Sequence, residues 1–264
     1  VRLCARAILV VAGDGGLIMR PTMKARRAML RFSTIGAMLV MLLLGPPVRA
    51  QYAQVALTAT NVTTGSRFGA DVAIADDTII VGAPHDYVAG QGDGAVCIFR
   101  RSGVNWVNEA KLKASDGGPG DYLGFSGAIS GDTAVAGAYG DDVGAAKNLG
   151  SAYVFTRSGS TWSEQQKLTA SDAGAGDHFG LSVGVSGDTI VVGSPYDYDG
   201  TVQSGSAFVF SRSAGVWTEQ AKLVPSDPSD YMEFGGHVAI QGDTVVVGAY
   251  RDRELGQAAG AAYM

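Results

Sequence analysis

The sequence predicts an all-β fold, a β-propeller built from four-stranded antiparallel blades, and three regularities support this prediction. A Phe-Gly or Leu-Gly pair recurs at intervals of 55, 56 and 55 residues, at Phe68-Gly69, Leu123-Gly124, Phe179-Gly180 and Phe234-Gly235. An Asp-Thr pair begins nine residues after the start of each pair, and a Gly-Ala or Gly-Ser pair begins after fourteen. Trp106, Trp162 and Trp217 keep the same spacing. Apolar, turn and aromatic positions that repeat together indicate a tandem array of one structural unit.

The third repeat shows which strands the unit contains. Residues 179–185 and 190–193 are short β-rich runs joined by the turn Ser186-Gly187-Asp188. After a loop, residues 206–211 alternate small or polar with large apolar side chains, and a second turn leads into residues 216–224. The repeat lacks the 3.6-residue period of an amphipathic helix. Each repeat is therefore expected to form four antiparallel strands, named a to d in chain order.

A sheet of this kind has two apolar faces and cannot bury both alone, so the repeats are expected to stack face to face. The right-handed twist of β-strands turns such a stack into a ring around an axis. We expect the glycines that flank strand a to lie beside this axis, where backbones approach closely. The Trp and Lys-Leu positions of strand d are expected at the outer edge.

The period also gives the domain boundaries. Residues 1–50 are interpreted as an N-terminal extension plus signal peptide, and residues 51–264 as propeller repeats, with units near 68–122, 123–178, 179–233 and 234–264. Residues 52–60 align with strand d through Leu57, so an outer strand precedes the first repeat. The last repeat matches strands a to c. Either the two ends share the last blade, or the chain is a fragment of a larger propeller; we favour the fragment, because a shortened strand c leaves an unpaired edge.

The first fifty residues have the pattern of a secretory signal peptide. Basic residues including Lys24, Arg26 and Arg27 precede the apolar run 35–44, and the small residues near position 50 predict cleavage after Ala50. A membrane anchor is the alternative, but the uncharged stretch 32–48 is shorter than the ~20 residues that a spanning helix needs. Because the segment before Met19 and Met23 resembles neither signal nor repeat, we expect translation to start at one of these methionines.

The charge distribution disfavours two classes of partner. Eight of the 20 Lys and Arg residues and one of the 25 Asp and Glu residues lie in the first fifty positions, which leaves a formal charge of −12 on residues 51–264. Such a surface repels phosphate backbones and anionic lipids, so we expect no nucleic-acid partner, and no stable membrane span after signal cleavage. Cys97 is the single cysteine after position 50 and is expected in a buried strand without a disulfide.

At these motifs the chain resembles the FG-GAP repeat family, whose best-known members are the propeller domains of integrin alpha chains. The resemblance covers residues 52–264 and rests on Phe68-Gly69 with Gly82-Ala83-Pro84 and on Phe179-Gly180 with Gly193-Ser194-Pro195. The repeated Ser-Gly-Asp-Thr and Ser-Ala-Tyr-Val-Phe segments are similar to the exported bacterial branch. The resemblance implies a β-propeller outside the cytoplasm, secreted or at the cell surface, that acts in protein binding or cell adhesion.

The integrin-type repeat holds calcium in an Asp/Asn-rich loop between strands a and b, because this hard cation takes six to eight oxygen ligands. This chain departs from that pattern. Its a–b connections are short turns such as Ser130-Gly131-Asp132-Thr133, with too few oxygens for a calcium cage. The family's calcium site is therefore not carried over, no cofactor is expected, and a Gly-Asp hairpin turn explains the aspartates.

Other aspartates recur on one rim of the expected propeller, opposite c–d turns that carry arginines (Arg100, Arg101, Arg157, Arg212). They are Asp86, Asp141, Asp197 and Asp252 in the b–c loops, and Asp116, Asp172 and Asp227 with Asp121, Asp177 and Asp230 in the d–a loops. One interpretation is that they cap turns by accepting backbone N–H bonds. The other is weak binding of a divalent cation or polar ligand, for which Asp197 and Asp199 in Asp197-Tyr198-Asp199-Gly200 are the candidate metal ligands.

The sequence predicts no catalytic residues. Gly180-Leu181-Ser182-Val183-Gly184 matches the G-x-S-x-G nucleophile pattern, but it overlies strand a and no helix follows it. His85, His178 and His237 occupy three different positions of the repeat and are interpreted as surface substitutions.

The function expected from these observations is that of an exported, non-enzymatic binding or adhesion scaffold, with a protein or glycan ligand at the propeller face. Regular strands with variable loop tips favour recognition over catalysis. Two alternatives remain: the non-catalytic propeller part of a longer secreted hydrolase, and a structural surface or matrix protein.

Overall fold

The computed structural model describes residues 7–10, 54–88, 91–142, 144, 146–198, 200, 202–253, 256 and 259–264. The expected signal peptide, its cleavage after Ala50 and the expected start at Met19 or Met23 lie outside the described residues. The chain divides into two compact units, residues 58–264 with 1–7, and residues 8–57. Strand β2 (Gln54–Leu57) pairs with β1 (Ala7–Val10) in a two-stranded sheet.

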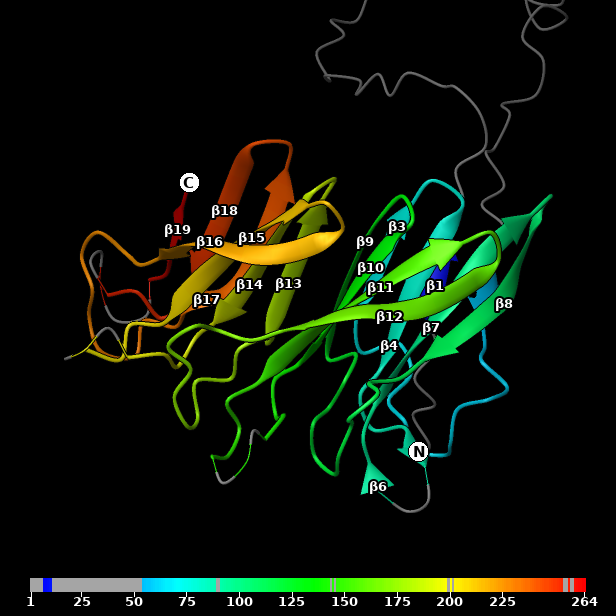
Figure 1. Cartoon of the computed structure of the whole chain (residues 1–264), viewed down its shortest axis with the longest axis horizontal. Coiled ribbons are helices and arrows are strands. Elements are labelled where there is room, and N and C mark those ends of the chain that lie inside the picture. Colours follow the sequence, from blue (N-terminus) through cyan, green and yellow to red (C-terminus); the bar gives the residue numbers. More distant parts are fainter. Residues whose placement is uncertain are drawn as a thin grey trace, which may run out of the picture. The chain divides into compact units, whose positions relative to one another are not determined.

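The larger unit is a series of antiparallel sheets, one for each repeat in chain order, which we number as blades 1 to 4 (Figure 1). Blade 1 contains β3 (Val72–Ala75), β4 (Thr78–Ala83), β7 (Ala95–Ser102) and β8 (Asn105–Leu112). Blade 2 contains β9 (Ser126–Ser130), β10 (Thr133–Ala138), β11 (Ser151–Ser158) and β12 (Thr161–Leu168). Blade 3 contains β13 (Ser182–Ser186), β14 (Thr189–Ser194), β15 (Ser206–Ser213) and β16 (Val216–Leu223). Blade 4 contains β17 (Phe234–Gln241), β18 (Thr244–Ala249) and β19 (Ala261–Tyr263).

The predicted fold class is confirmed: the structure is an all-β propeller, with no helix among the described residues. In blades 1 to 3 the strands pair in the order a-b-c-d, as the sequence predicts, and the described part of blade 4 pairs as a-b-c. A short hairpin of β5 (Tyr87–Val88) and β6 (Gln91–Gly92) lies in the b–c loop of blade 1. No helix long and apolar enough to cross a membrane occurs in the described part of the chain.

Apolar side chains fill the space between neighbouring blades. Ile80 and Ile98 of blade 1 pack in one cluster with Tyr153 and Trp162 of blade 2. Val154 of blade 2 lies in a second cluster with residues of blade 3, and a third cluster joins blades 3 and 4. The strand-d tryptophans Trp162 and Trp217 belong to these clusters and are nearly buried. Blades 2 and 3 are therefore packed on both faces against their neighbours in the stack, as the sequence suggests.

The repeated glycines lie where the backbones of adjacent blades meet. A Cβ added to Gly137 would lie 1.9 Å from the carbonyl oxygen of Gly180 in the next blade. The same 1.9 Å approach occurs from Gly82 to the Gly124 oxygen and from Gly193 to the Gly235 oxygen. The predicted close approach beside strand a is confirmed, and it explains why the Phe/Leu-Gly and Gly-Ala/Ser motifs recur together: one supplies the carbonyl, the other the missing side chain.

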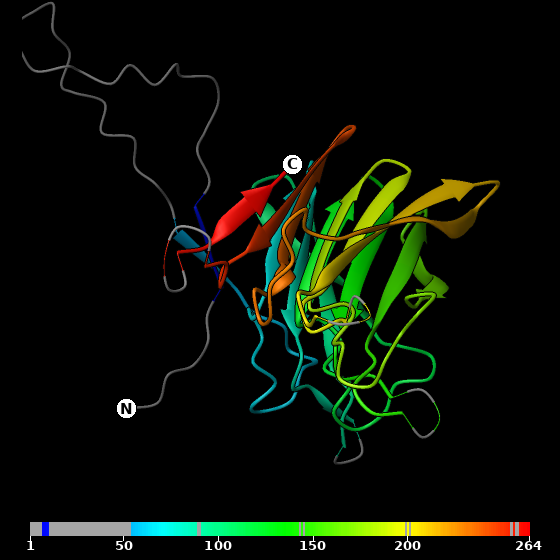
Figure 2. The same cartoon turned by 90° about the vertical axis from the view of Figure 1, so that its left-hand side faces the viewer.

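The connections divide between two faces of the propeller (Figures 1 and 2). The short a–b and c–d turns form one face, here called the turn face; examples are Gly131-Asp132 and Gly159-Ser160. The longer b–c and d–a loops form the opposite face, here called the loop face; examples are residues 139–150 and 169–181. Cys97 is buried in β7, and burial raises the pKa of its thiol to about 11.

Candidate functional site: the loop face

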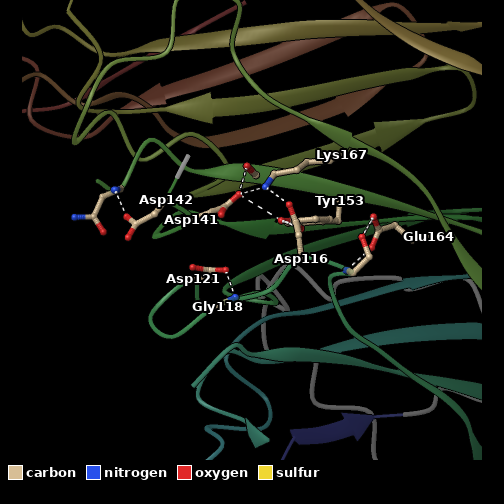
Figure 3. Close-up of polar contacts among 11 residues, drawn as sticks. Asp116, Gly118, Asp121, Asp141, Asp142, Tyr153, Glu164 and Lys167 are labelled. Carbon is tan, nitrogen blue, oxygen red and sulfur yellow. Dashed lines mark hydrogen bonds and ion pairs between the residues drawn. The ribbon is translucent and has the colours of Figure 1, made fainter. Parts of the chain in front are cut away.

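The predicted rim aspartates are tied to lysines of strand d. In blade 2 the Lys167 ammonium lies 2.7 Å from Asp116 and 2.6 Å from Asp141 (Figure 3). The Tyr153 hydroxyl donates a hydrogen bond of 2.7 Å to Asp116, and the Ser151 hydroxyl donates to Asp141. Asp116 lies in the d–a loop between β8 and β9, and Asp141 lies in the b–c loop of blade 2. This carboxylate–lysine cluster therefore holds both loops against strands β11 and β12.

The same arrangement recurs in the neighbouring blades. In blade 3 the Lys222 ammonium lies 2.6 Å from both Asp172 and Asp197. In blade 1 Lys111 is paired with Asp86. In blade 4 the Tyr263 hydroxyl lies 2.8 Å from both Asp227 and Asp252. The rim carboxylates thus share one structural role, which is to hold the loops of the loop face against the blades.

The pKa shifts in the blade 2 cluster favour the charged forms of Asp116 and Lys167 and the neutral form of Tyr153. Burial opposes ionisation of Asp116, but the hydrogen bonds from Lys167 and Tyr153 outweigh it and lower its pKa. Burial also disfavours the charged Lys167, yet the hydrogen bonds that it donates to Asp116 and Asp141 raise its pKa. The pKa of Tyr153 is raised, first by burial and then by its bond to Asp116, so the phenol keeps its proton.

Two further loop aspartates cap turns, as the first interpretation predicts. Asp121 accepts a hydrogen bond from the Gly118 N–H at 2.5 Å, and Asp177 accepts one from the Gly174 N–H at 2.6 Å. Both carboxyl groups are nearly buried. Burial, aided by the neighbouring charges of Asp141 and Asp197, raises the pKa of each to about 6.

Of the candidate metal ligands, Asp197 is described and Asp199 lies outside the described residues. The Asp197 side chain is buried and its carboxylate is occupied by the Lys222 ammonium. Within the described residues, no group of three or more His, Cys, Asp or Glu side chains is arranged to hold a metal ion. The Asp197 oxygen Oδ2 thus already has a cationic partner, and cation binding at Asp197 and Asp199 stays a prediction.

The turn face repeats a second set of contacts. The Arg157 guanidinium binds Asp132 of the a–b turn, reaches Thr78 of blade 1 at 3.3 Å and lies over the Trp162 ring. Arg212 repeats these contacts with Asp188, Thr133 of blade 2 and Trp217. Each arginine thus joins a turn of its own blade to the preceding blade, with the same side chains each time.

A row of aromatic side chains crosses the loop face from blade 1 to blade 3. The aromatic row consists of His85, Tyr122, Tyr139, His178 and Tyr196, each half-buried. Neighbouring ring centroids lie 5.0 to 5.2 Å apart along it, and Phe125 packs edge-on against Tyr139 at 4.7 Å. His85 and His178, interpreted as surface substitutions, lie half-buried on the loop face, and their imidazoles are also members of this row.

Two members of the row, Tyr122 and His178, occupy equivalent positions of the repeat. The residue before each Phe/Leu-Gly pair has a positive φ, 53° for Arg67, 59° for Tyr122, 56° for His178 and 57° for Glu233. Side chains other than glycine rarely adopt this conformation, and its repetition concentrates backbone strain on the loop face. One backbone conformation thus carries four different side chains, of which Arg67 is exposed, Tyr122 and His178 are half-buried and Glu233 is buried.

The groups of the aromatic row are uncharged. Burial lowers the pKa of His178, and burial with the nearby Arg67 charge lowers that of His85, so both imidazoles stay neutral at pH 7. Burial raises the pKa of Tyr139 and Tyr196. Neutral imidazoles and phenols each offer both a hydrogen-bond donor and an acceptor.

On blade 4 the loop face carries charged side chains. The Arg251 guanidinium pairs with the buried Glu233 carboxylate at 2.8 Å and lies over the Tyr250 ring. A hydrogen bond from Tyr250 to Glu233, together with burial, raises the pKa of Tyr250 to about 12.

Next to the row, the first strands of the blades line a cavity of about 460 Å³. Phe125 belongs both to this lining and to the ring contact with Tyr139, so cavity and row share this side chain. Ser182 of the G-x-S-x-G segment also lines the cavity, where its hydroxyl donates a 2.8 Å hydrogen bond to the Gly235 carbonyl. That bond joins blades 3 and 4.

These features define the class of tandem β-propeller repeats, in which glycine contacts join the blades and the loops carry the variable side chains. The family model described as FG-GAP repeat matches residues 53–99, 106–155, 162–210 and 217–264. The chain therefore belongs to the FG-GAP repeat family. A comparison with curated proteins finds no match.

Proposed function

We propose that the protein is an exported, non-enzymatic binding or adhesion scaffold whose ligand contacts the aromatic row on the loop face. The observation that carries the proposal is the pairing of a constant backbone with variable side chains at Arg67, Tyr122 and His178, which are exposed or half-buried. A strained backbone conformation that is kept at equivalent positions while the side chain changes is expected where the side chains contact a ligand.

The composition of this surface also supports binding. Tyrosine is enriched at the centres of protein interfaces because it combines a large apolar ring with a polar tip and loses little conformational entropy. The half-buried rings of Tyr122, Tyr139 and Tyr196 are held by their neighbours, so few rotamers are lost when a ligand docks. A FG-GAP propeller offers a rigid frame for such a surface, and the role that we propose needs no cofactor.

The test is a solid-phase binding assay with the full chain on surfaces coated with matrix proteins or polysaccharides. The test variant is Tyr122→Ala/Tyr139→Ala, and the matched control is Val104→Ser/Val216→Ser, which changes two exposed apolar residues beside the c–d turns of the turn face. We expect at least one coat to retain the wild type and the control, and the test variant to bind it at least about tenfold more weakly. Absence of binding to every coat, or equal loss in both variants, contradicts the proposal.

Export is tested separately. Expression of the full chain in a bacterial host is expected to release a product that begins at residue 51, as read by mass spectrometry of its N-terminal peptide. A product that retains the residues before Ala50 contradicts export by signal cleavage.

A further inference from the structure

The geometry points to a ligand class for the aromatic row: we propose that it binds a neutral oligosaccharide or polysaccharide, with sugar rings packed on Tyr122, Tyr139 and Tyr196. This inference rests on the proposed function, since it names the ligand of the same surface. Three properties of the described residues support it: the spread of the row over several blades, its neutrality, and the pairing of the charges around it.

The row is extended and repetitive. Its rings run without a gap from His85 of blade 1 through Tyr122 and Tyr139 to His178 and Tyr196 of blade 3. A compact ligand would touch only part of it. A polymer of similar units can place one unit after another along rings that the repeats present at regular intervals, and each added contact raises the affinity.

The hydrogen-bonding groups of the row match hydroxyl groups. Each phenol and each neutral imidazole can both donate and accept, and each sugar hydroxyl does the same. The lowered pKa values of His85 and His178 and the raised pKa values of Tyr139 and Tyr196 keep these groups in that uncharged form. The C–H faces of a sugar ring are apolar and pack on aromatic rings, so a saccharide can contact the solvent-exposed parts of these half-buried rings as well as their polar groups.

The charges near the row disfavour ionic ligands. Asp86, Asp141 and Asp197 are paired with lysines of strand d, and Glu233 is paired with Arg251. A cationic ligand would have to displace these partners to gain a carboxylate. An anionic ligand could approach the Arg67 charge near His85, but it would meet the net charge of −12 on residues 51–264. A neutral ligand meets neither cost.

The experiment is calorimetric titration of the full chain with defined probes. The neutral probes are cello-, xylo-, manno- and malto-oligosaccharides of one, three and six units; the comparison probes are an anionic hexagalacturonide, a neutral hexapeptide and a lysine-containing hexapeptide. We expect one neutral series to bind, with an affinity that rises at least about tenfold from the single sugar to six units. Such length dependence is not expected if the rings only stabilise the fold.

The variants separate stacking from folding. Tyr122→Ala and Tyr139→Ala are expected to weaken binding of the six-unit probe at least about tenfold, and Tyr122→Phe, which keeps the ring, at most about threefold. Val104→Ser is the matched control and is expected to bind as the wild type does. Because Tyr139 is half-buried, the melting temperature of each variant is measured first. If the alanine variants unfold, Tyr122→Leu, which keeps an apolar side chain but removes the ring, takes their place and is expected to weaken binding at least about tenfold.

The outcomes distinguish the two proposals. If no neutral series binds but a peptide or the hexagalacturonide binds with the same dependence on Tyr122, the saccharide inference is overturned and the proposed function stands. If a neutral series binds equally well to Tyr122→Ala, Tyr139→Ala and wild type, the aromatic row is not its site and the inference is also overturned. If none of the probes binds and none of the coated surfaces retains the chain, both proposals fail.

Discussion

The turn face and the loop face of the propeller differ in what is constant from repeat to repeat. On the turn face the same contacts repeat: Arg157 and Arg212 each bind an a–b turn aspartate, a threonine of the preceding blade and a tryptophan. On the loop face the backbone repeats but the side chains differ, as Arg67, Tyr122, His178 and Glu233 show. Side chains that repeat maintain the stack, and side chains that vary on a constant backbone are free to recognise a ligand.

The largest effect is expected at the glycine contacts on which both faces depend. Gly137→Ala places a Cβ 1.9 Å from the Gly180 carbonyl oxygen and 2.3 Å from the Ser126 hydroxyl, so the blades must move apart. We expect a loss of about 3 kcal/mol in the free energy of unfolding by urea denaturation. Gly159→Ala is the control: its φ is 64° with open space around it, and it should cost only about 1 kcal/mol. Equal costs for the two variants would mean that the interblade contact does not limit stability.

A smaller loss is expected when a loop-face cluster is broken. Lys167→Met leaves the buried Asp141 carboxylate without its ammonium, and we expect it to cost about 2 kcal/mol in the same assay. Arg212→Met is the matched change on the turn face and should cost about 1 kcal/mol, because its partner Asp188 is largely exposed. Adding Asp141→Asn to Lys167→Met should restore part of the loss. A turn-face variant that costs as much as Lys167→Met would remove the contrast between the faces.

The pH dependence of stability probes the loop face alone. The pKa of Asp121 is raised from 3.8 to about 6, so its contribution is present below pH 3.8 and is lost as the pH rises through 6. Asp121→Asn keeps an acceptor for the Gly118 N–H and removes the charge. We expect it to stabilise the protein by on the order of 1 kcal/mol at pH 7.5, with no gain at pH 4, in urea denaturation at the two pH values.

Asp142→Asn provides the control for this change. The pKa of Asp142 is lowered by its hydrogen bonds from Lys147 and from the Asn148 N–H, so its removal should bring no gain at pH 7.5. A gain of the same size in both variants would show that net charge, rather than burial of Asp121, sets the pH dependence.

The smallest effect is expected from exchanging side chains at the constant backbone position. Arg67 and Tyr122 share nearly the same φ, and Arg67 is exposed. Arg67→Tyr should therefore change the free energy of unfolding by less than about 0.5 kcal/mol. A loss above about 1.5 kcal/mol would mean that the side chain at this position is structural, and that the variation around the loop face does not reflect recognition.

The sequence predicts the frame of this molecule better than its surface. The four-strand repeat and the close approach at Gly82, Gly137 and Gly193 follow from one period, because an array of equal units must repeat its tight contacts. The lysine partners of the rim aspartates could also have been predicted. Asp86, Asp141 and Asp197 precede Lys111, Lys167 and Lys222 by 25 or 26 residues, a regularity that indicates pairing across strands c and d.

The aromatic row could not be predicted by comparing equivalent positions of the repeats. Tyr122 and His178 occupy the position before Leu-Gly or Phe-Gly. His85 and Tyr196 lie three residues after the glycine of Gly-Ala or Gly-Ser, and Tyr139 lies two residues after it. Only the packing of d–a loops against b–c loops of the preceding and same blades brings these rings together. The residues differ between repeats, so the period that predicts the strands does not predict this surface.

The most direct test of the account is hydrogen–deuterium exchange of the full chain with and without a ligand that binds it. The account predicts that protection appears in loop-face segments around Tyr122, Tyr139 and His178, while the c–d turns around Val104 and Val216 exchange as before. Protection confined to those turns, or spread evenly over both faces, would contradict the claim that the loop face is the recognition surface.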